Sequence, residues 1–467
     1  MGTGGIIAFG LWAVVALVLY SQLPVGRATI WTFLGAQMLL PAAGSFKVPV
    51  LSPIDKALVP TLCAAIGIFF IASRSRSPRF RLGWPLVLLT LAVGVPILSS
   101  LANEDTILIG DRVLPGVGFY DGFSSAELAL FTVLPFVFGR RALRTEQDSE
   151  DLLRALMLAG IIYSLPMLFE VRFSPQLHYW VYGYYSSDFI QAIRGGGYRP
   201  MVFMGHGLIA SFFMMATLVA AVALWRARAP SRLPVKAGPV AGYLGLVLLL
   251  CKSLGAAFYA LIAVPLVRFA TPRTMLRVAV LLSVISVGYP LLRTEGLVPT
   301  GSILSVVRLW SEERADSLEF RFINEDQLLE RANQRILTGW GRFGRNRVYA
   351  EWGSDVSVTD GRWIIVLGQY GVFGFLAEFG LLTYGVFRAL GALKYVRSER
   401  EAVYLGAIAL ILALNVLDLL PNSALLPLTF LMAGSLVGRS ENLVARSRKR
   451  TRLIERPQDQ LNAPAYS

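Results

Sequence analysis

Long apolar runs alternate with short polar segments along most of this sequence. A helix needs roughly 20 mainly apolar residues to cross about 30 Å of hydrocarbon, and about thirteen runs approach this length. Peptide groups find no hydrogen-bonding partner in lipid, so each run is expected to be helical. The pattern predicts an all-α polytopic membrane protein with about 12–13 transmembrane helices. The predicted spans are 5–22, 26–43, 57–73, 83–101, 122–139, 151–169, 201–225, 237–253, 254–270, 276–293, 361–388, 401–418 and 421–438.

Arginine and lysine concentrate in every second polar segment. Cytoplasmic loops of membrane proteins carry an excess of these residues. If the spans alternate in direction, all the basic clusters lie on one side, which is therefore predicted to be the cytoplasm. The same alternation places the N-terminus on the opposite side. The clusters are Arg74 to Arg81, Arg140 to Arg144, Arg226 to Lys236, Arg273 to Arg277, Lys394 to Arg400 and Arg446 to Arg452.

Three longer polar segments lie on the predicted exterior side, at residues 102–121, 170–200 and 294–360. The last is the only long polar passage in the middle of the chain. It contains an amphipathic charged run followed by a turn rich in glycine and arginine. We expect one membrane domain over residues 1–445, without a second soluble domain. Residues 446–467 are expected to form a basic, disordered cytoplasmic tail.

The composition supports this class of protein. Hydrophobic residues make up 55% of the chain and charged residues 16%, whereas soluble domains carry about 25% charged residues. The net charge of +14 marks the cytoplasmic face, so no nucleic-acid partner is expected. Cys63 and Cys251 lie inside apolar runs and are expected to pack there without a disulfide. The sequence contains no phosphate-binding loop, HExxH motif or carboxylate–histidine metal spacing, so we expect no metal and no cofactor.

Several arginines lie on the exterior side, against the usual distribution of positive charge. They can pair with neighbouring acids on a solvated helix face, as we expect for Arg331 and Arg335. Others lie in glycine-rich turns, where the backbone can approach a ligand closely. A guanidinium group suits the oxygens of a diphosphate. The arginines that we assign as candidate substrate-binding residues are Arg194, Arg199, Arg321, Arg342 and Arg345.

Two residues are candidates for proton transfer. His206 precedes an apolar span, where it can cap the helix or contact the substrate and accept a proton. Asp360 precedes another span, where it can be a helix N-cap or deprotonate a sugar hydroxyl.

Four further polar residues lie near apolar runs. Lys252 is a candidate substrate-binding residue or marks the turn between two spans, and Glu378 is a functional candidate because it is ionisable within a span. His178 is expected at the surface. Asp418 is expected in a structural turn.

Several motifs resemble those of the bacterial O-antigen polymerase and ligase superfamily. The segment from Thr359 to Phe375 is similar to its aspartate or histidine before an apolar helix ending in G-I-x-G. Ser317-x-x-x-Arg321 and the run Ile336 to Gly344 resemble its S-x-x-x-R and G-x-G motifs. Arg199 to His206 is similar to its first exterior arginine segment, and Lys252 to Gly255 lies where members often have S-R-G.

The spacing of arginine and glycine adds to this resemblance. Arg194 to Gly205 and Arg342 to Gly353 match the R-x10-G pattern found in both exterior loops of some polymerases. The family also implies two functional periplasmic loops, the second of them long and partly helical.

The resemblance implies a metal-independent glycosyltransferase of the helical, GT-C-like kind in the bacterial inner membrane. Such an enzyme transfers a glycan from undecaprenyl diphosphate to a lipid-linked repeat unit on the periplasmic side, with the arginines holding the diphosphate. His206 or Asp360 then orients or deprotonates the acceptor. A chain-length regulator and a flippase of the same pathway are the implied partners.

Two alternatives stay open. The histidine–asparagine pair typical of the ligases is replaced by Asp360-Gly361, which favours a polymerase over an O-antigen ligase that transfers glycan to lipid A core. A transporter or flippase of lipid-linked sugar would need polar residues across several spans, and the predicted spans contain few.

Overall fold

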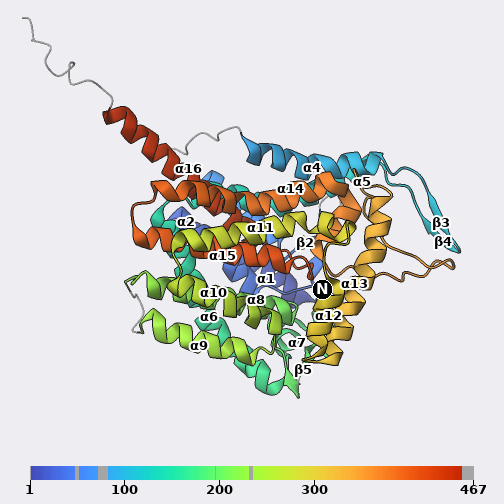
Figure 1. The fold of residues 1–467 in the computed structure, drawn as a ribbon, viewed down its shortest axis with the longest axis horizontal. Helices are drawn as coiled ribbons and strands as arrows, with labels where there is room; N and C mark the ends of the chain where they lie inside the picture. Colours follow the sequence, from blue (N-terminus) through green and yellow to red (C-terminus); the bar gives the residue numbers. More distant parts are fainter. Residues whose placement is uncertain (1, 48–51, 72–82, 195, 231–234, 455–467) are drawn as a thin grey trace, which may run out of the picture.

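The computed structural model describes residues 2–47, 52–71, 83–194, 196–230 and 235–454, and this part of the chain is predominantly helical (Figure 1). Each predicted span coincides with a helix. The helices are α1 (Thr3–Gln22), α2 (Val25–Leu39), α3 (Leu58–Ile66, continued by a π-helical turn over Gly67–Ile71), α4 (Trp84–Leu101), α5 (Phe119–Ala142), α6 (Glu146–Phe173), α8 (Gly207–Arg226), α9 (Ala237–Leu250), α10 (Leu254–Phe269), α11 (Pro272–Thr294), α14 (Arg362–Ala392), α15 (Glu399–Asp418) and α16 (Pro427–Ile454).

In the described part of the chain, 8 helices are long and apolar enough to cross a membrane: α1, α4, α5, α6, α8, α11, α14 and α15. Three shorter apolar helices, at α3 with its π-helical turn, α9 and α10, accompany them. The chain is thus a helical, polytopic membrane protein, and the higher number of spans stays a prediction.

The helices lie side by side, and the longer connecting segments gather at one end of the bundle (Figure 1). We call this the loop end and define it by residues 40–47, 52–57, 102–118, 174–194, 196–206, 295–361 and 419–426. The N-terminus also lies there, with Gly2 and Gly4 against Tyr182 and Val181. The connections α5–α6 and α10–α11 lie at the opposite end, where five of the predicted basic clusters begin. The cluster Arg74 to Arg81 lies outside the described residues.

The loop end has its own secondary structure. The short helices α7 (Leu177–Tyr182) and α12 (Thr300–Arg308) lie there, with the longer polar helix α13 (Glu312–Asn333). Three two-stranded hairpins accompany them: β1 (Ser45–Phe46) with β2 (Ile54–Asp55), β3 (Ile107–Ile109) with β4 (Arg112–Leu114), and β5 (Ile193–Arg194) with β6 (Gly197–Tyr198). Short 3-10 turns cover Phe189–Ala192 here and Leu393–Tyr395 at the opposite end.

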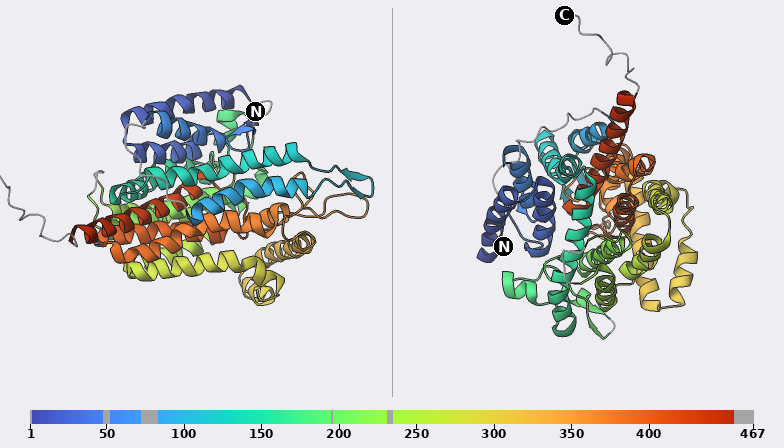
Figure 2. Two further views of the ribbon diagram at one scale, coloured as in Figure 1. Left: turned by 90° about the horizontal axis from the view of Figure 1, so that it is seen from above. Right: turned by 90° about the vertical axis from the view of Figure 1, so that its left-hand side faces the viewer.

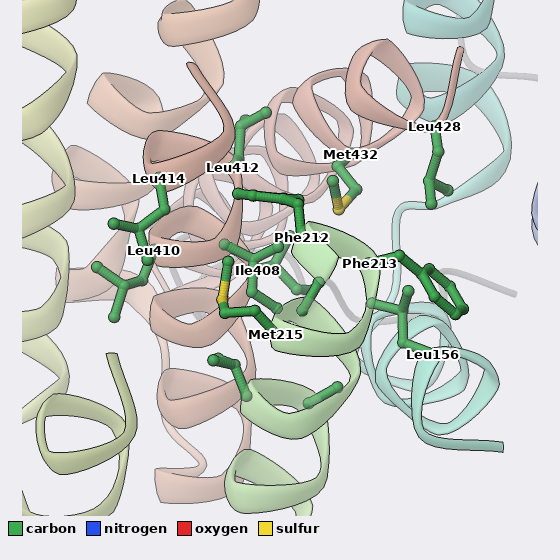
Figure 3. Close-up of a cluster of buried hydrophobic side chains, with 14 of the residues drawn as sticks. Leu156, Phe212, Phe213, Met215, Ile408, Leu410, Leu412, Leu414, Leu428 and Met432 are labelled. Carbon is green, nitrogen blue, oxygen red and sulfur yellow. The ribbon is translucent and has the colours of Figure 1, made fainter. Parts of the chain in front are cut away.

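The core is formed by side chains of α8 and α15 with neighbours from α6 and α16 (Figure 3). Phe212 and Met215 of α8 and Ile408 and Leu412 of α15 are all buried. Two effects stabilise this core. Folding removes apolar side-chain surface from water, and close packing between helices replaces their contacts with lipid. Helices α1 to α3 form a separate layer on one side (Figure 2), with a small apolar cluster of their own.

One prediction for the C-terminus is wrong. Helix α16 continues to Ile454, so residues 446–454, which we expected to be disordered, are helical. Arginine, lysine and leucine favour helix, and this stretch directly extends an apolar helix. Residues 455–467 lie outside the described part.

Helix α14 is broken inside its apolar stretch. Gly371 has φ +63° and ψ −167°, which divides the helix into two arms. The glycine-rich turn of the 295–361 segment packs into this break: Trp340 N–H donates to Gly368 O (2.8 Å) and Gly341 N–H to Gln369 O (2.9 Å). The carbonyl oxygens that lose their helical hydrogen bonds at the break therefore accept hydrogen bonds from the turn. The break fixes the turn and the start of α14 relative to each other.

Candidate functional site

Six of the predicted site residues come together at the loop end. Arg194 belongs to β5, Arg199 follows β6, and Arg321 lies midway along α13. We call these three residues the arginine cluster. His206 at the start of α8, Asp360 just before α14 and Lys252 between α9 and α10 lie beside them. Residues far apart in sequence thus create one strongly positive surface.

Arg199 is the least compensated charge of the cluster. Its Nη2 donates to Lys252 O at 3.5 Å, and its Nε is buried without a hydrogen-bonding partner among the described residues. Burial, together with the charges of Arg194, Arg314 and Arg321, lowers the pKa of Arg199 to about 10. No carboxylate in the described part of the chain forms an ion pair with it. A half-buried cation without a counterion is poorly solvated, so this position favours an anionic ligand.

Arg321 and Asp360 form an ion pair, with 3.3 Å between Nε and Oδ2. Both side chains are partly exposed, at 31% and 39%. The cap position of α14 is occupied by Gly361 rather than Asp360. The alternative that Asp360 caps this helix is therefore wrong, and its carboxylate instead lies at the rim of the cluster.

His206 caps α8. Leu208 N–H donates to Nδ1 at 3.1 Å, so Nδ1 is the acceptor nitrogen and the proton of the neutral ring is on Nε2. Nε2 then donates to Gln191 Oε1 at 3.0 Å. Burial lowers the pKa of His206, Arg199 and Arg321 lower it further, and Asp360 opposes them. Because both nitrogens are engaged, His206 could accept a proton only by losing the cap, and Asp360 is the more accessible base.

Arg194 and Lys252 complete the positive surface. Arg194 Nη1 lies 3.1 Å from Glu313 Oε1, an exposed pair that contributes little in water. Lys252 Nζ donates to Arg194 O at 3.2 Å, and Lys252 adopts a left-handed conformation with φ +53°. Lys252 both marks the turn between α9 and α10 and adds charge beside Arg199.

Arg345 has a structural role and does not belong to the cluster. Its side chain is fully buried, and its guanidinium donates to Trp340 O, Asp105 O, Pro115 O and Asp105 Oδ1 at 2.8–3.2 Å. These bonds join the glycine-rich turn to the β3–β4 hairpin. The substrate-binding role predicted for Arg345 conflicts with this burial, because four of the five N–H donors of its guanidinium are already used within the protein.

Arg342 also lies apart from the cluster, beside the break in α14. Its charge interacts with Tyr370, and its guanidinium carbon is 5.5 Å from the ring centroid of Phe343. The neighbouring Arg331 and Arg335 stack on Trp340, at 3.3 and 4.2 Å from its centroid. Arg335 also pairs with Asp105. Arg342 therefore faces different partners from Arg199.

The structure places Asp418 at the expected turn but places His178 differently from its prediction. Asn422 Nδ2 donates to Asp418 Oδ1 at 3.0 Å, just after the end of α15. Asp418 also lies close enough to Arg321 for their charges to interact, and Tyr259 hydrogen-bonds to it. His178 is only 3% exposed, since Ala42 N–H donates to its Nε2 and its Nδ1 donates to Tyr184 O. It joins two loops instead of lying at the surface.

Among the residues that the structure describes, no group of three or more histidine, cysteine, aspartate or glutamate side chains is arranged to hold a metal ion. In comparisons with known proteins, no family model matches the chain and no curated protein matches it significantly. The case for a function therefore depends on the site itself and on the motif resemblance.

Proposed function

We propose that this protein is a polysaccharide polymerase of the bacterial inner membrane. It transfers an undecaprenyl-diphosphate-linked glycan to a lipid-linked repeat unit on the periplasmic face. The observation that supports this most is the uncompensated guanidinium of Arg199 beside Arg194 and Arg321. Planar guanidinium groups bind phosphate oxygens at two points. A diphosphate would supply the negative charge that this surface lacks.

In the proposed reaction, the bond between the anomeric carbon of the growing glycan and its diphosphate oxygen breaks. A new bond forms between that carbon and a hydroxyl oxygen of the acceptor sugar. The hydroxyl proton passes to Asp360, and the electron pair leaves with the lipid diphosphate. Arg194, Arg199 and Arg321 stabilise the leaving group as charge develops on it, as preorganised donors do in oxyanion holes.

Transfer by the purified protein is the direct test. Full-length protein in detergent is given a lipid-linked repeat unit, and the length of the lipid-linked glycan is measured. We expect elongation without any other enzyme, and a loss of about a hundredfold for Arg199→Met, in the range seen for one oxyanion donor. Arg308→Met is the matched control, because Arg308 lies on α12 and pairs with Glu319.

The same assay separates the alternatives. Lipid A core offered in place of the repeat unit would be the preferred acceptor of an O-antigen ligase, and a flippase would lengthen nothing. A deletion strain that accumulates single repeat units on the lipid carrier agrees with the polymerase. Unchanged polymer length in that strain contradicts it.

A further inference from the structure

A cavity lies at the loop end, outside the arginine cluster. It has a volume of about 340 Å³, within the range of small-molecule sites, roughly 300–1,000 Å³. Its walls come from α2, the β1–β2 segment, the start of α3 and the start of α16, and include Phe33, Gln37, Lys56, Pro60 and Leu425. The site proposed above uses none of these residues.

Lys56 brings an uncompensated cation to this cavity. Its Nζ donates to Phe203 O at 2.5 Å, which leaves further N–H donors of an ammonium group for a ligand. Burial alone lowers the pKa of Lys56 to about 7, because no neighbouring carboxylate raises it. Asp55 forms no ion pair with Lys56 in the described part of the chain, and its Oδ1 accepts from Ala57 N–H and Leu58 N–H. Residues 48–51, Val-Pro-Val-Leu, contain no acid either.

The side-chain oxygen of Gln37 is independent evidence that the cavity binds a ligand. Its side chain is only 7% exposed, and its Oε1 has no hydrogen-bonding partner among the described residues. A buried carbonyl oxygen without a donor costs about 1–3 kcal/mol. Gln37 lines the cavity, so a hydroxyl group of a ligand would satisfy it.

The remaining walls of the cavity are mainly apolar, with Ser45 and Asp55 as the polar exceptions. A smaller hollow of about 80 Å³ adjoins the cavity and shares Asp55, Ala57 and residues 425–427 with it. Leu128, Phe131 and Phe430 continue its lining between α5 and α16. The cavity thus has a polar head and an apolar extension along helices of the membrane bundle. A lipid likewise combines a polar headgroup with an apolar chain.

We propose that the Lys56–Gln37 cavity binds the phosphate and hydroxyl-bearing headgroup of a membrane lipid. The phosphate pairs with Lys56 Nζ, a headgroup hydroxyl donates to Gln37 Oε1, and the first part of the hydrocarbon chain lies along the apolar extension. Two sources share this chemistry: a glycerophospholipid such as phosphatidylglycerol, and a polyprenyl-phosphate-linked sugar. This inference does not depend on the polymerase reaction.

The cavity and the arginine cluster are joined through two loops. Phe203 O accepts a hydrogen bond from Lys56 Nζ, and the loop that contains Phe203 also contains Arg199 and His206. Pro421 O accepts from Arg321 at 3.4 Å, and Leu425 on the same loop lines the cavity. A lipid in the cavity would therefore support both walls of the arginine site.

Thermal unfolding of the full-length protein in a neutral detergent tests the proposal. Added phosphatidylglycerol is expected to raise the unfolding midpoint of the natural protein, because a ligand that binds only the folded state stabilises it. Phosphatidylcholine, which lacks the headgroup hydroxyls and a net charge, should raise it far less. Lys56→Met and Gln37→Leu should each weaken the apparent affinity for phosphatidylglycerol about tenfold.

Two control variants make the result specific. Lys47→Met changes an exposed lysine of the same segment, and Arg199→Met changes the arginine cluster; both should keep the full response to phosphatidylglycerol. A Lys56→Met protein that responds like Lys47→Met overturns the proposal, and so does an Arg199→Met protein that loses the response. If Lys56→Met does not fold, the response of Gln37→Leu to phosphatidylglycerol is compared with that of Lys47→Met instead.

Further ligands identify the source of the headgroup. Glycerol phosphate and inorganic phosphate should act only at much higher concentrations than the lipid, since they lack the chain, and equal potency would overturn the lipid assignment. A polyprenyl-phosphate-linked sugar that outcompetes phosphatidylglycerol in a Lys56-dependent way assigns the cavity to a lipid-linked sugar. The opposite order assigns it to the bulk phospholipid.

Discussion

Arg362 and Glu378 form a two-point ion pair within α14, although 16 residues separate them. Arg362 Nε and Nη2 lie 2.7 and 2.6 Å from the two carboxylate oxygens. In a straight helix this separation would span about 24 Å, far beyond the reach of the side chains. The pair exists because α14 breaks at Gly371. The functional candidate Glu378 thus anchors the first arm of α14, next to Asp360.

We expect Gly371→Ala to destabilise the protein strongly. A Cβ at this position would come within 2.3 Å of Leu337 O, and φ is +63°. A backbone with φ +63° and ψ −167° is essentially restricted to glycine and costs another residue roughly 1–3 kcal/mol, and the clash adds to this. Thermal unfolding in detergent should show a clear drop in the midpoint. Gly391→Ala, also in α14 but with open space around it, should show none. Equal midpoints for the two variants would contradict this account of the break.

Substitutions of Arg362 and Glu378 should have non-additive effects on the stability of the protein. Glu378→Met or Arg362→Met leaves a poorly hydrated charge without its partner, which typically costs about 3–5 kcal/mol. The double variant removes both charges and should lose less stability than either single variant. A double-mutant cycle of unfolding midpoints measures this coupling. Purely additive effects would mean that the pair is not formed.

Arg199 and Arg345 should respond differently to substitution. Arg199→Met should leave the unfolding midpoint unchanged or raise it, because a half-buried cation without a counterion is removed, while transfer activity falls. Arg345→Met should lower the midpoint by an amount that reflects about 3 kcal/mol or more, because several buried acceptors lose their donor. Comparing midpoint and activity for both variants distinguishes a ligand-binding arginine from a structural one.

The stability of the protein should fall on mild acidification. The pKa of His206 in the folded state lies below the ordinary value of 6.5, so the unfolded chain binds the proton more readily. The contribution is fully present above about pH 7 and is lost as pH falls through 6.5 towards the lower folded pKa. His206→Asn keeps a good N-cap but removes this titration. Its unfolding midpoint should therefore depend less on pH between 7 and 5. An unchanged slope would show that His206 is not neutral in the folded protein.

Much of the architecture followed from local features of the sequence. The length of each apolar run predicted a helix at each of the thirteen positions, since lipid leaves the backbone no other way to satisfy its hydrogen bonds. The alternation of the runs predicted that the 102–121, 170–200 and 294–360 segments meet at one end with the N-terminus. The residue types around Arg199 and Asp360 indicated a positive site there.

Only the tertiary structure decided which of these residues act together. Arg199 and Arg345 look alike in sequence, yet one lacks a counterion and the other binds the β3–β4 hairpin through acceptors 230 to 240 residues away. Cys63 and Cys251 are buried and free, as expected. The burial of His178, the tautomer of His206 and the isolation of Lys56 and Gln37 also depend on contacts between distant segments. Local sequence determines whether a residue can be charged or helical, but solvation and hydrogen bonding depend on neighbours that folding brings together.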